Sequence, residues 1–207
     1  MKTRIISQSD PGAAAAALEI IRAGGVVAVP TDTVYGIACA VDNPTAIRQL
    51  YQIKERDALK AIPVLVGTHD HLENLALDFN TAARQLALRF WPGALTVIVE
   101  KNPDLPAELT LYPTVGLRMP AYDWLLALMR TCGPLAATSA NLSGAPSPAT
   151  AEEVLVQLDG RVELIVDGGR CEGGIPSTMV DCSQELVKVL REGGIPSADI
   201  FQVISDV

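Results

Sequence analysis

Residues 10–30 read DPGAAAAALEIIRAGGVVAVP, and this stretch decides the fold class of the chain. Asp10 is a typical helix N-cap, the proline after it suits a first helical turn, and the glycine pair at 24–25 is typical of a helix end. The alanine-rich run 13–23 therefore predicts a helix. The apolar run 26–30 follows at once and predicts a buried strand. A helix that leads directly into a buried strand indicates an α/β protein.

The rest of the chain repeats this alternation of short apolar runs and helical patterns. We expect about eight short strands and five helices, with the strand 186–191 as the last element. Asn43, Thr68, Asn80 and Thr150 each stand directly before a helical pattern and are predicted N-caps. This order predicts one twisted, mostly mixed β-sheet with flanking helices. The loops at the strand ends are then expected to carry the functional site.

Composition and charge exclude several classes of protein. At 207 residues the chain 1–207 fits a single domain that buries a core without disulfides or metals. Its apolar runs are far shorter than the roughly 20 residues of a membrane span, and its N-terminus lacks the apolar core of a secretory signal. We therefore expect no membrane association and a cytoplasmic protein. The net charge of −8 argues against sequence-independent binding of nucleic acid by the whole protein surface, so any basic patch must be local.

The sequence lacks the common signatures of metal and nucleotide sites. Its four cysteines are far apart with no Cys-x-x-Cys pair, and His69 and His71 have no evident third ligand, so no metal site is predicted. Neither a Walker A pattern nor a Gly-x-Gly-x-x-Gly fingerprint occurs. Because both histidines lie on one short segment, neither a Ser-His-Asp triad nor histidine acid–base chemistry is expected.

Polar side chains cluster instead at strand ends. Residues 30–36, PTDTVYG, place Thr31, Thr33 and a carboxylate in a tight turn between two apolar strands. Such a turn suits a small polar ligand, but it is equally typical of a plain Asx or Thr turn. Lys54 and Arg56 follow the end of a predicted helix. They either complement the helix dipole or bind a triphosphate, the lysine as a point charge and the arginine as a bidentate fork.

Further polar residues lie near the later strands. Ser139 and Asn141 follow a strand and are suited either to contact phosphate or ribose or simply to form a turn. Arg118 stands in an apolar strand, where a buried guanidinium needs an anionic partner. That partner is either an Asp or Glu side chain or a ligand carboxylate, and we favour the ligand. The hydroxyl pair 177–178 and Arg191 are weak signals alone. Together these residues indicate a concave, anion-binding cavity in an acidic protein.

These segments, in this order, resemble the YrdC family of threonylcarbamoyladenylate synthases over about residues 5–200. The stretch 30–38 is similar to the family's Pro-Thr-Asp/Glu-Thr-Val-Tyr-Gly-Leu block, and 90–96 is similar to its Trp-Pro-Gly-x-Leu-Thr block. The family's Lys-x-Arg and Ser-x-Asn signature is present as Lys54, Arg56, Ser139 and Asn141.

The resemblance implies a nucleotidyltransferase reaction. Threonine and bicarbonate give a carbamate whose carboxylate attacks the α-phosphate of ATP, which forms L-threonylcarbamoyladenylate and releases pyrophosphate. A separate transferase complex then uses the product for N6-threonylcarbamoyladenosine modification of tRNA. Mg²⁺ is implied by the triphosphate and binds mainly through phosphate oxygens and water. Carried over to this sequence, the catalytic residues are Lys54 and Arg56, the ATP-contacting residues are Lys54, Arg56, Thr114, Ser139, Asn141 and Arg191, and the threonine-contacting residues are Thr31, Thr33, Arg118 and Thr178.

Two features depart from the family pattern and keep alternatives open. Residues 57–62 replace the proline and the Lys-Pro-Leu-like stretch that usually follow the Lys-x-Arg signature. From the length of the sequence we also expect it to lack the second C-terminal domain that some members carry. One alternative is a YrdC-like paralogue with lost or altered activity, similar to the carbamoyl-handling domains of hydrogenase maturation factors. Another is an RNA-binding module that binds RNA weakly, against which the net charge of −8 counts. One methyl group supplies only about 1–3 kcal/mol of discrimination, so weak use of serine is expected.

Overall fold

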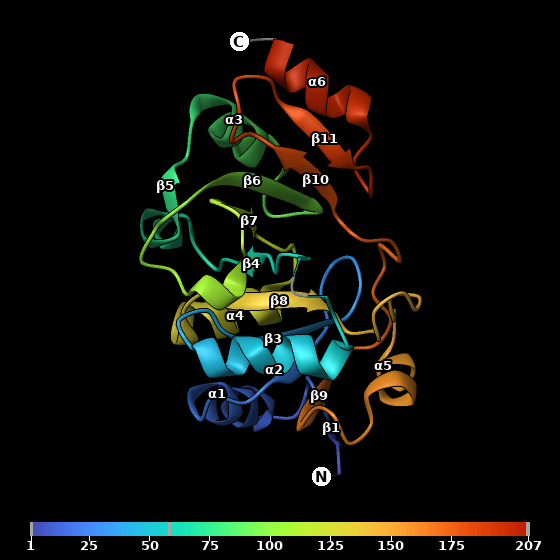
Figure 1. The fold of residues 1–207 in the computed structure, drawn as a ribbon. Coiled ribbons are helices and arrows are strands. Elements are labelled where there is room, and N and C mark those ends of the chain that lie inside the picture. Colours follow the sequence, from blue (N-terminus) through green and yellow to red (C-terminus); the bar gives the residue numbers. More distant parts are fainter. Residues whose placement is uncertain (1, 58, 206–207) are drawn as a thin grey trace.

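The computed structural model describes residues 2–57 and 59–205 and has the α/β fold that the sequence predicts (Figure 1). The strands are β1 (Arg4–Ser7), β2 (Val27–Val29), β3 (Gly36–Ala40), β4 (Val64–Leu65), β5 (Ala76–Asp78), β6 (Leu95–Lys101), β7 (Thr114–Arg118), β8 (Leu135–Ser139), β9 (Leu164–Asp167), β10 (Thr178–Asp181) and β11 (Lys188–Arg191). The helices are α1 (Ala13–Arg22), α2 (Pro44–Lys54), α3 (Thr81–Phe90), α4 (Asp123–Cys132), α5 (Ala151–Leu158) and α6 (Ser197–Ser205), with the short 3-10 helices η1 (His69–Asn74) and η2 (Ala107–Leu109).

The eleven strands of the described residues lie in one mixed sheet. Its order is β1-β9-β2-β3-β8-β4-β7-β6-β10-β11, and β5 pairs with β6 outside this path. The sheet contains parallel pairs such as β4 with β7 and β6 with β10, and antiparallel pairs such as β3 with β8 and β6 with β7. The predicted fold class, a mostly mixed sheet with flanking helices, is therefore confirmed. The assignment of residues 1–207 to one domain stays a prediction.

Cap residues set where the helices begin. Three predicted caps are confirmed, because the side chain accepts a hydrogen bond from the backbone N–H three residues further on, at 3.0, 3.0 and 3.2 Å for Asn43, Asn80 and Thr150. The predicted cap at Asp10 is wrong. Its carboxylate accepts from the Gly12 N–H at 2.7 Å and closes a turn before the helix, so α1 begins only at Ala13. Thr68 makes no side-chain cap bond and precedes the 3-10 helix η1.

The sequence analysis missed β1, β5 and α6. β1 and β5 are short and largely exposed, so neither contributes the continuous apolar run that marked the other strands. α6 lies beyond β11, which was expected to be the last element. It packs against α3 and buries Ile200. The missed elements lie at the margins of the sheet, where of the predicted strands only β11 also lies at an edge.

The helices cover the sheet unevenly along its length. Figure 1 shows α1 and α2 at the end that holds the N-terminus, and α3 and α6 beside β10 and β11 at the end that holds the C-terminus. α1 packs against β2, β3, β9 and α4, while α3 packs against β6. The core strand β2 is buried over its whole length. None of the helices in the described ranges is long and apolar enough to cross a membrane.

Candidate functional site

A cavity of about 210 Å³ lies where the ends of several strands meet. Its walls come from the turn 31–36, the segment after α2, the first residues of β6 and β10, and the last residues of β7, β8 and β11. The predicted site residues that line it are Thr31, Thr33, Arg56, Arg118, Ser139 and Arg191. Segments far apart in the sequence thus bring three arginines and several hydroxyls to one place.

Arg118, at the end of β7, is only 7% exposed. Its Nη2 donates to Asp32 Oδ1 at 2.6 Å, and its Nη1 donates to Thr33 Oγ1 at 2.9 Å. Its Nε donates to the carbonyl oxygen of Gly93 at 3.0 Å. Burial lowers the pKa of Arg118, and the Asp32 carboxylate acts in the opposite direction. The sequence favoured a ligand carboxylate as the anionic partner of Arg118, but the partner in the structure is the protein carboxylate of Asp32. Three of the five guanidinium N–H groups are used, so two remain for a ligand.

Arg56 and Arg191 are held by main-chain carbonyl groups. Arg56 donates from Nε to Lys60 O and from Nη2 to Ala61 O, both at 3.0 Å. Arg191 donates from Nε and Nη2 to Ser177 O at 3.1 and 2.8 Å. Burial lowers the pKa of both arginines, and the charge of Arg56 lowers that of Arg191 further. Because no Asp or Glu is among the described lining residues, the cavity carries an excess of positive charge that suits an anion.

Hydrogen bonds within the turn occupy the Thr31 hydroxyl fully and leave the Thr33 hydroxyl available to a ligand. A carbonyl group only accepts, so Thr31 donates its single hydroxyl proton to Val34 O at 2.7 Å. Thr31 Oγ1 also accepts from the N–H groups of Thr33 and Val34 at 3.1 and 3.2 Å, which fills its two lone pairs, so its 3.0 Å contact with Thr33 Oγ1 does not commit the proton of Thr33. Thr33 Oγ1 accepts from Arg118 Nη1. The Thr33 hydroxyl therefore keeps its proton and one lone pair, so it can both donate to and accept from a ligand in the cavity.

Lys54 lies beneath the loop that follows β8 and is 1% exposed. Its Nζ donates to the carbonyl oxygens of Ser139 and Asn141, the second at 2.7 Å, and contacts Asn141 Oδ1 at 3.3 Å. Burial, with Arg56 nearby, lowers the pKa of Lys54 to about 7. The three oxygen acceptors favour the ammonium form and act against this shift. Lys54 is thus directed at the backbone of the loop.

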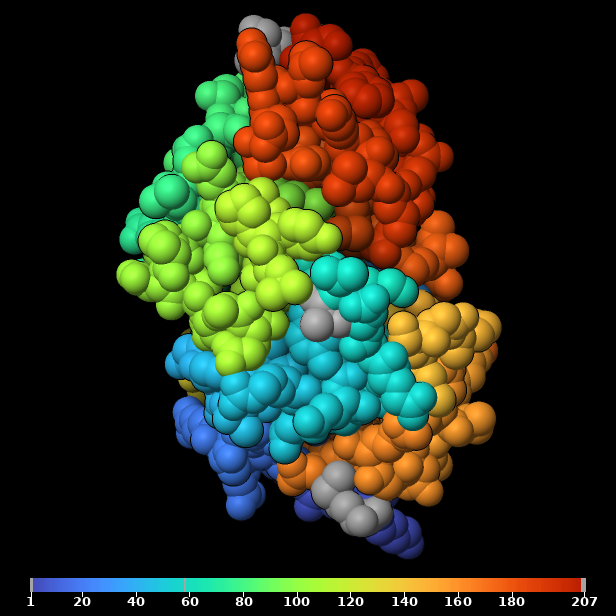
Figure 2. All heavy atoms as spheres, in the orientation of Figure 1, coloured from blue at the N-terminus to red at the C-terminus, as the bar shows by residue number. Residues whose placement is uncertain are grey.

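Asn141 belongs to the same buried network. Its Nδ2 donates to the carbonyl oxygens of Leu142 and Ala145 at 2.7 and 2.8 Å. The Ser143 N–H returns a hydrogen bond to Lys54 O at 2.8 Å. In Figure 2 the segment around residues 50–65 (cyan) accordingly lies against the segment around 140–150 (gold). Neither Lys54 nor Asn141 is among the described lining residues of the cavity, which places both behind Ser139 rather than beside it.

Thr114 and Thr178 also lie outside the lining of the cavity, as far as the described residues define it. Thr178 is fully buried, and its hydroxyl donates to Ile195 O at 2.7 Å and accepts from the N–H groups of Gly193 and Ile195 at 2.8 and 3.1 Å. It fastens the C-terminal segment to the start of β10. Thr114 begins β7 and pairs with Glu100 of β6, four residues before Arg118. Its side chain lies on the same face of the strand as Arg118, because strand side chains alternate.

Several hydroxyl-bearing residues of the cavity lining were not predicted as site residues, among them Thr96 and Ser177. Thr96 Oγ1 and Ser177 Oγ lie 2.8 Å apart, both buried, on the paired strand starts of β6 and β10. Ser177 was noted in the sequence only as part of a weak signal. Thr96 lies inside an apolar strand and had no signal other than its place in the 90–96 block.

The histidine segment forms no metal site in the described structure. His69 and His71 lie in η1, and His71 Nδ1 accepts a hydrogen bond from the Gly67 N–H at 3.2 Å. Burial lowers the pKa of His71. Within residues 2–57 and 59–205, no group of three or more His, Cys, Asp or Glu side chains is arranged to hold a metal ion.

Gly193 passes so close to the start of β10 that a side chain does not fit. A Cβ at this position would overlap Pro176 O and lie 2.6 Å from Thr178 N, and both are backbone atoms. We expect Gly193→Ala to lower the free energy of unfolding by about 1–3 kcal/mol, because the backbone must move. Urea unfolding of the variant measures this loss. Gly194→Ala is the matched control, since its Cβ would be 3.4 Å from that of Ala94, an ordinary contact. Equal stability of the two variants would contradict the prediction.

The fold and the cavity together define a mixed α/β protein with a cavity whose positive charge suits an anion. The Sua5/YciO/YrdC family model, described as telomere recombination, matches residues 19–193. The chain therefore belongs to this family.

Named relatives and a solved structure are similar over most of the chain. Threonylcarbamoyl-AMP synthase of Bacillus subtilis is 42% identical over 98% of this chain, and that of Pyrococcus abyssi is 38% identical over 90%. The structure of P. abyssi Sua5 complexed with L-threonine has a TM-score of 0.93 and 35% identity, and covers 99% of this chain and 62% of that one. The match spans only 59% and 56% of the two synthases' own lengths.

Proposed function

We propose that this chain is a threonylcarbamoyl-AMP synthase, which forms threonylcarbamoyl-AMP and pyrophosphate from L-threonine, bicarbonate and ATP. The observation that carries the proposal is the convergence of Arg56, Arg118 and Arg191 on one cavity in a protein of net charge −8. Guanidinium groups bind phosphate and carboxylate oxygens in bidentate fashion, so this cavity suits a triphosphate beside an amino-acid carboxylate. The synthases that are 42% and 38% identical to this chain support the proposal.

Threonine is assigned to the Arg118 end of the cavity. The two unused N–H groups of Arg118 suit the threonine carboxylate. The Thr33 hydroxyl suits the polar groups of the substrate, because its lone pair can accept from the substrate hydroxyl or amino group and its proton can bind a substrate oxygen. Thr31 holds the turn that carries Thr33 by accepting from the Thr33 N–H at 3.1 Å. Support comes from the similar P. abyssi Sua5 structure, which is described as a complex with L-threonine.

ATP is assigned to the other side, with Arg56, Arg191 and Ser139 at its phosphates. The volume of about 210 Å³ is below the roughly 300–1,000 Å³ of pockets that enclose drug-sized ligands, so part of the nucleotide must extend into solvent. Thr114 remains the candidate for a contact with that part. We propose that Lys54 and Asn141 act on ATP indirectly, by holding the loop that presents Ser139. Thr178 likewise supports the segment that carries Arg191.

The proposed reaction has two steps. The threonine amine attacks bicarbonate, the new N–C bond forms and water leaves, which gives a carbamate. A carbamate oxygen then attacks the α-phosphorus of ATP, the bond from that phosphorus to the bridging oxygen breaks, and pyrophosphate leaves with the bond electrons. Positioning and arginine charge drive this displacement without a protein base. Mg²⁺ enters as part of the Mg·ATP substrate and is held by phosphate oxygens and water.

Pyrophosphate release from Mg·ATP and bicarbonate, measured with and without L-threonine, tests the proposed function. We expect release that depends on threonine and stops when EDTA removes Mg²⁺. Release without threonine dependence, or none at all, would favour the paralogue with altered activity. Analysis of the nucleotide product by mass spectrometry separates threonylcarbamoyl-AMP from AMP formed by simple hydrolysis.

Loss of the Thr33 hydroxyl should weaken the use of threonine specifically. Thr33→Val keeps the shape of the side chain but removes the acceptor, and we expect kcat/KM for threonine to fall by about 10- to 100-fold, the value of one or two buried hydrogen bonds. Thr33→Ser keeps the hydroxyl and should stay near the original activity. Steady-state pyrophosphate release at varied threonine measures both. An equal loss in the two variants would mean that the methyl group matters as much as the hydroxyl, and a loss in Thr33→Ser alone would contradict the role of the hydroxyl.

The product is proposed to pass to a separate complex that transfers the threonylcarbamoyl group to tRNA in the cytoplasm. The alternative of an RNA-binding module is disfavoured by the net charge of −8, because counterion release needs clustered cations. A titration of tRNA binding at increasing salt tests for weak RNA binding. Affinity that persists at about 0.2 M salt would argue for a direct RNA-binding role.

A further inference from the structure

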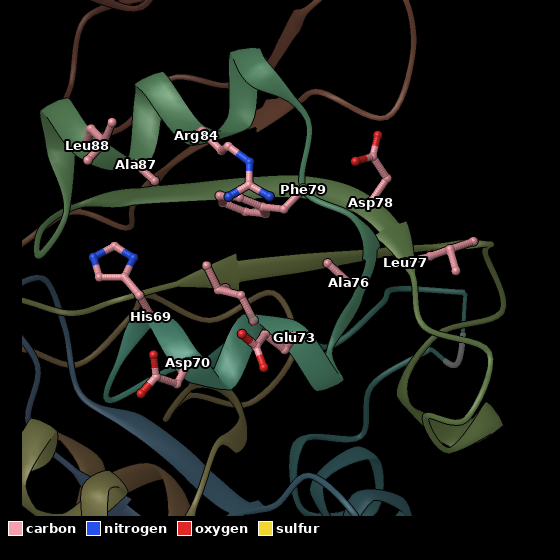
Figure 3. Close-up of a pocket in the computed structure, with 11 residues that line it drawn as sticks. His69, Asp70, Glu73, Ala76, Leu77, Asp78, Phe79, Arg84, Ala87 and Leu88 are labelled. Atoms are coloured by element: carbon pink, nitrogen blue, oxygen red, sulfur yellow. The ribbon is translucent and has the colours of Figure 1, made fainter.

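A second and larger cavity, of about 610 Å³, lies on another part of the molecule (Figure 3). Its walls are α3 on one side and η1 on the other, and β5 with Phe79 closes one end. In the described residues it shares no lining residue with the arginine cavity. The reaction proposed above gives it no role.

Charged side chains of both signs line this cavity without pairing. Asp70 and Glu73 lie on η1, Asp78 on β5 and Arg84 on α3. Among the described residues, none of the four side chains makes a hydrogen bond or an ion pair with the protein. Arg84 instead lies over the ring of Phe79, with its guanidinium carbon 5.9 Å from the ring centroid, and Figure 3 shows it across the cavity from Glu73. The cavity wall therefore carries three uncompensated carboxylates and one uncompensated guanidinium.

The cavity also combines a rigid aromatic base with exposed aliphatic side chains. Phe79 is 7% exposed and packs against Trp91 with ring centroids 6.0 Å apart. Leu77 and Leu88 stand at the rim with 65% and 78% of their surface exposed. Exposed leucines beside a buried aromatic ring are typical of a protein–protein contact, in which apolar anchors fill a groove and charges surround it.

We propose that this groove docks a partner-protein segment that carries apolar anchor side chains and a net positive charge. Its apolar side chains would cover Leu77, Leu88 and Phe79, and its basic side chains would pair with the carboxylates of η1 and β5. The Arg84 guanidinium would bind a carbonyl or carboxylate oxygen of the segment. A groove between two helical elements has the geometry that binds an amphipathic helix. Nucleic acid does not fit, because the three carboxylates repel phosphate.

Fluorescence anisotropy with two labelled peptides tests the proposal on the full chain. One probe is a 14-residue amphipathic helix of leucine and lysine, and the other replaces each lysine with glutamate. We expect the lysine peptide to bind with a Kd at or below about 100 µM and the glutamate peptide to bind at least about 10-fold more weakly. No binding of the lysine peptide, or equal binding of both peptides, would overturn the proposal.

Variants separate this groove from general attraction to an acidic protein. Glu73→Lys and Leu88→Gln change exposed residues of the groove, so the fold should tolerate both. Each variant should raise the Kd of the lysine peptide by at least about 10-fold. Glu19→Lys on α1 and Val156→Gln on α5, where the side chain is 86% exposed, make the same changes elsewhere and should leave binding within about 2-fold. Equal effects of the groove variants and the control variants would show that the groove is not the binding site.

Discussion

Arg118→Ala is expected to abolish threonine-dependent pyrophosphate release and to destabilise the protein. The arginine is 7% exposed, and its removal leaves the Asp32 carboxylate, 15% exposed, without its cation. Breaking a fully buried pair costs about 3–5 kcal/mol, and the partial exposure of Asp32 puts the expectation near the lower end. The same change removes the two N–H groups assigned to the threonine carboxylate. We expect kcat/KM for threonine to fall by at least about 10³-fold.

A double variant separates these two effects. In Arg118→Ala with Asp32→Ala no unpaired charge is left, so the free energy of unfolding should return to within about 1–2 kcal/mol of the original protein, while activity should stay absent. Urea unfolding and pyrophosphate release on the single and double variants measure both quantities. Arg130→Ala, at an exposed site near the end of α4, is the matched control and should change neither. Recovery of activity in the double variant would remove Arg118 from the threonine site.

The centre of the fold was predictable because it depends on local signals. Buried strands such as β2 are continuous apolar runs, and Asn43, Asn80 and Thr150 cap helices through hydrogen bonds within three residues of chain. β1 and β5 pair only at the margin of the sheet and lack such a run. A helical signal is present in α6, where Ser197 follows a proline and Ile200, Val203 and Ile204 have helical spacing. It lies after the strand that was expected to be the last element, so no helix was predicted there.

The site was predictable in its residue types and less so in their contacts. The sequence indicated a cavity with Arg56, Arg118 and Arg191, and the structure brings them together. Their partners are distant along the chain, such as Asp32 for Arg118 and Ser177 O for Arg191, and no local spacing encodes these contacts. The direction of Lys54 also depends on a loop 85 residues away, at Ser139. A basic residue after a helix gives no indication that it bonds main-chain oxygens instead of facing solvent.

Lys54→Met is expected to lower kcat/KM for ATP by about 10²–10³-fold, although Lys54 does not line the cavity. The methionine keeps most of the volume but leaves the carbonyl oxygens of Ser139 and Asn141 and the Asn141 amide oxygen without their shared donor. The loop should then move Ser139 away from the phosphates. Because Lys54 acts through the loop, Asn141→Ala should give a loss of similar size. The two losses should not add, since both variants break one network.

The pH dependence of stability gives a second measurement on Lys54. Its pKa in the folded protein is lowered to about 7 from an ordinary value of 10.5. Between these values the unfolded chain binds more protons than the folded one, so the contribution of Lys54 to the free energy of unfolding rises with pH, by at most about 1.4 kcal/mol per pH unit. Below about pH 7 both states are protonated and the contribution is constant. The difference in unfolding free energy between the original protein and Lys54→Met, measured from pH 6 to 10, isolates this dependence. A difference that stays flat up to pH 10 would mean that the three oxygen acceptors outweigh burial and hold the ammonium charged. A rise that begins near neutral pH would mean that Lys54 loses its proton there, and with it part of its hold on the loop that presents Ser139.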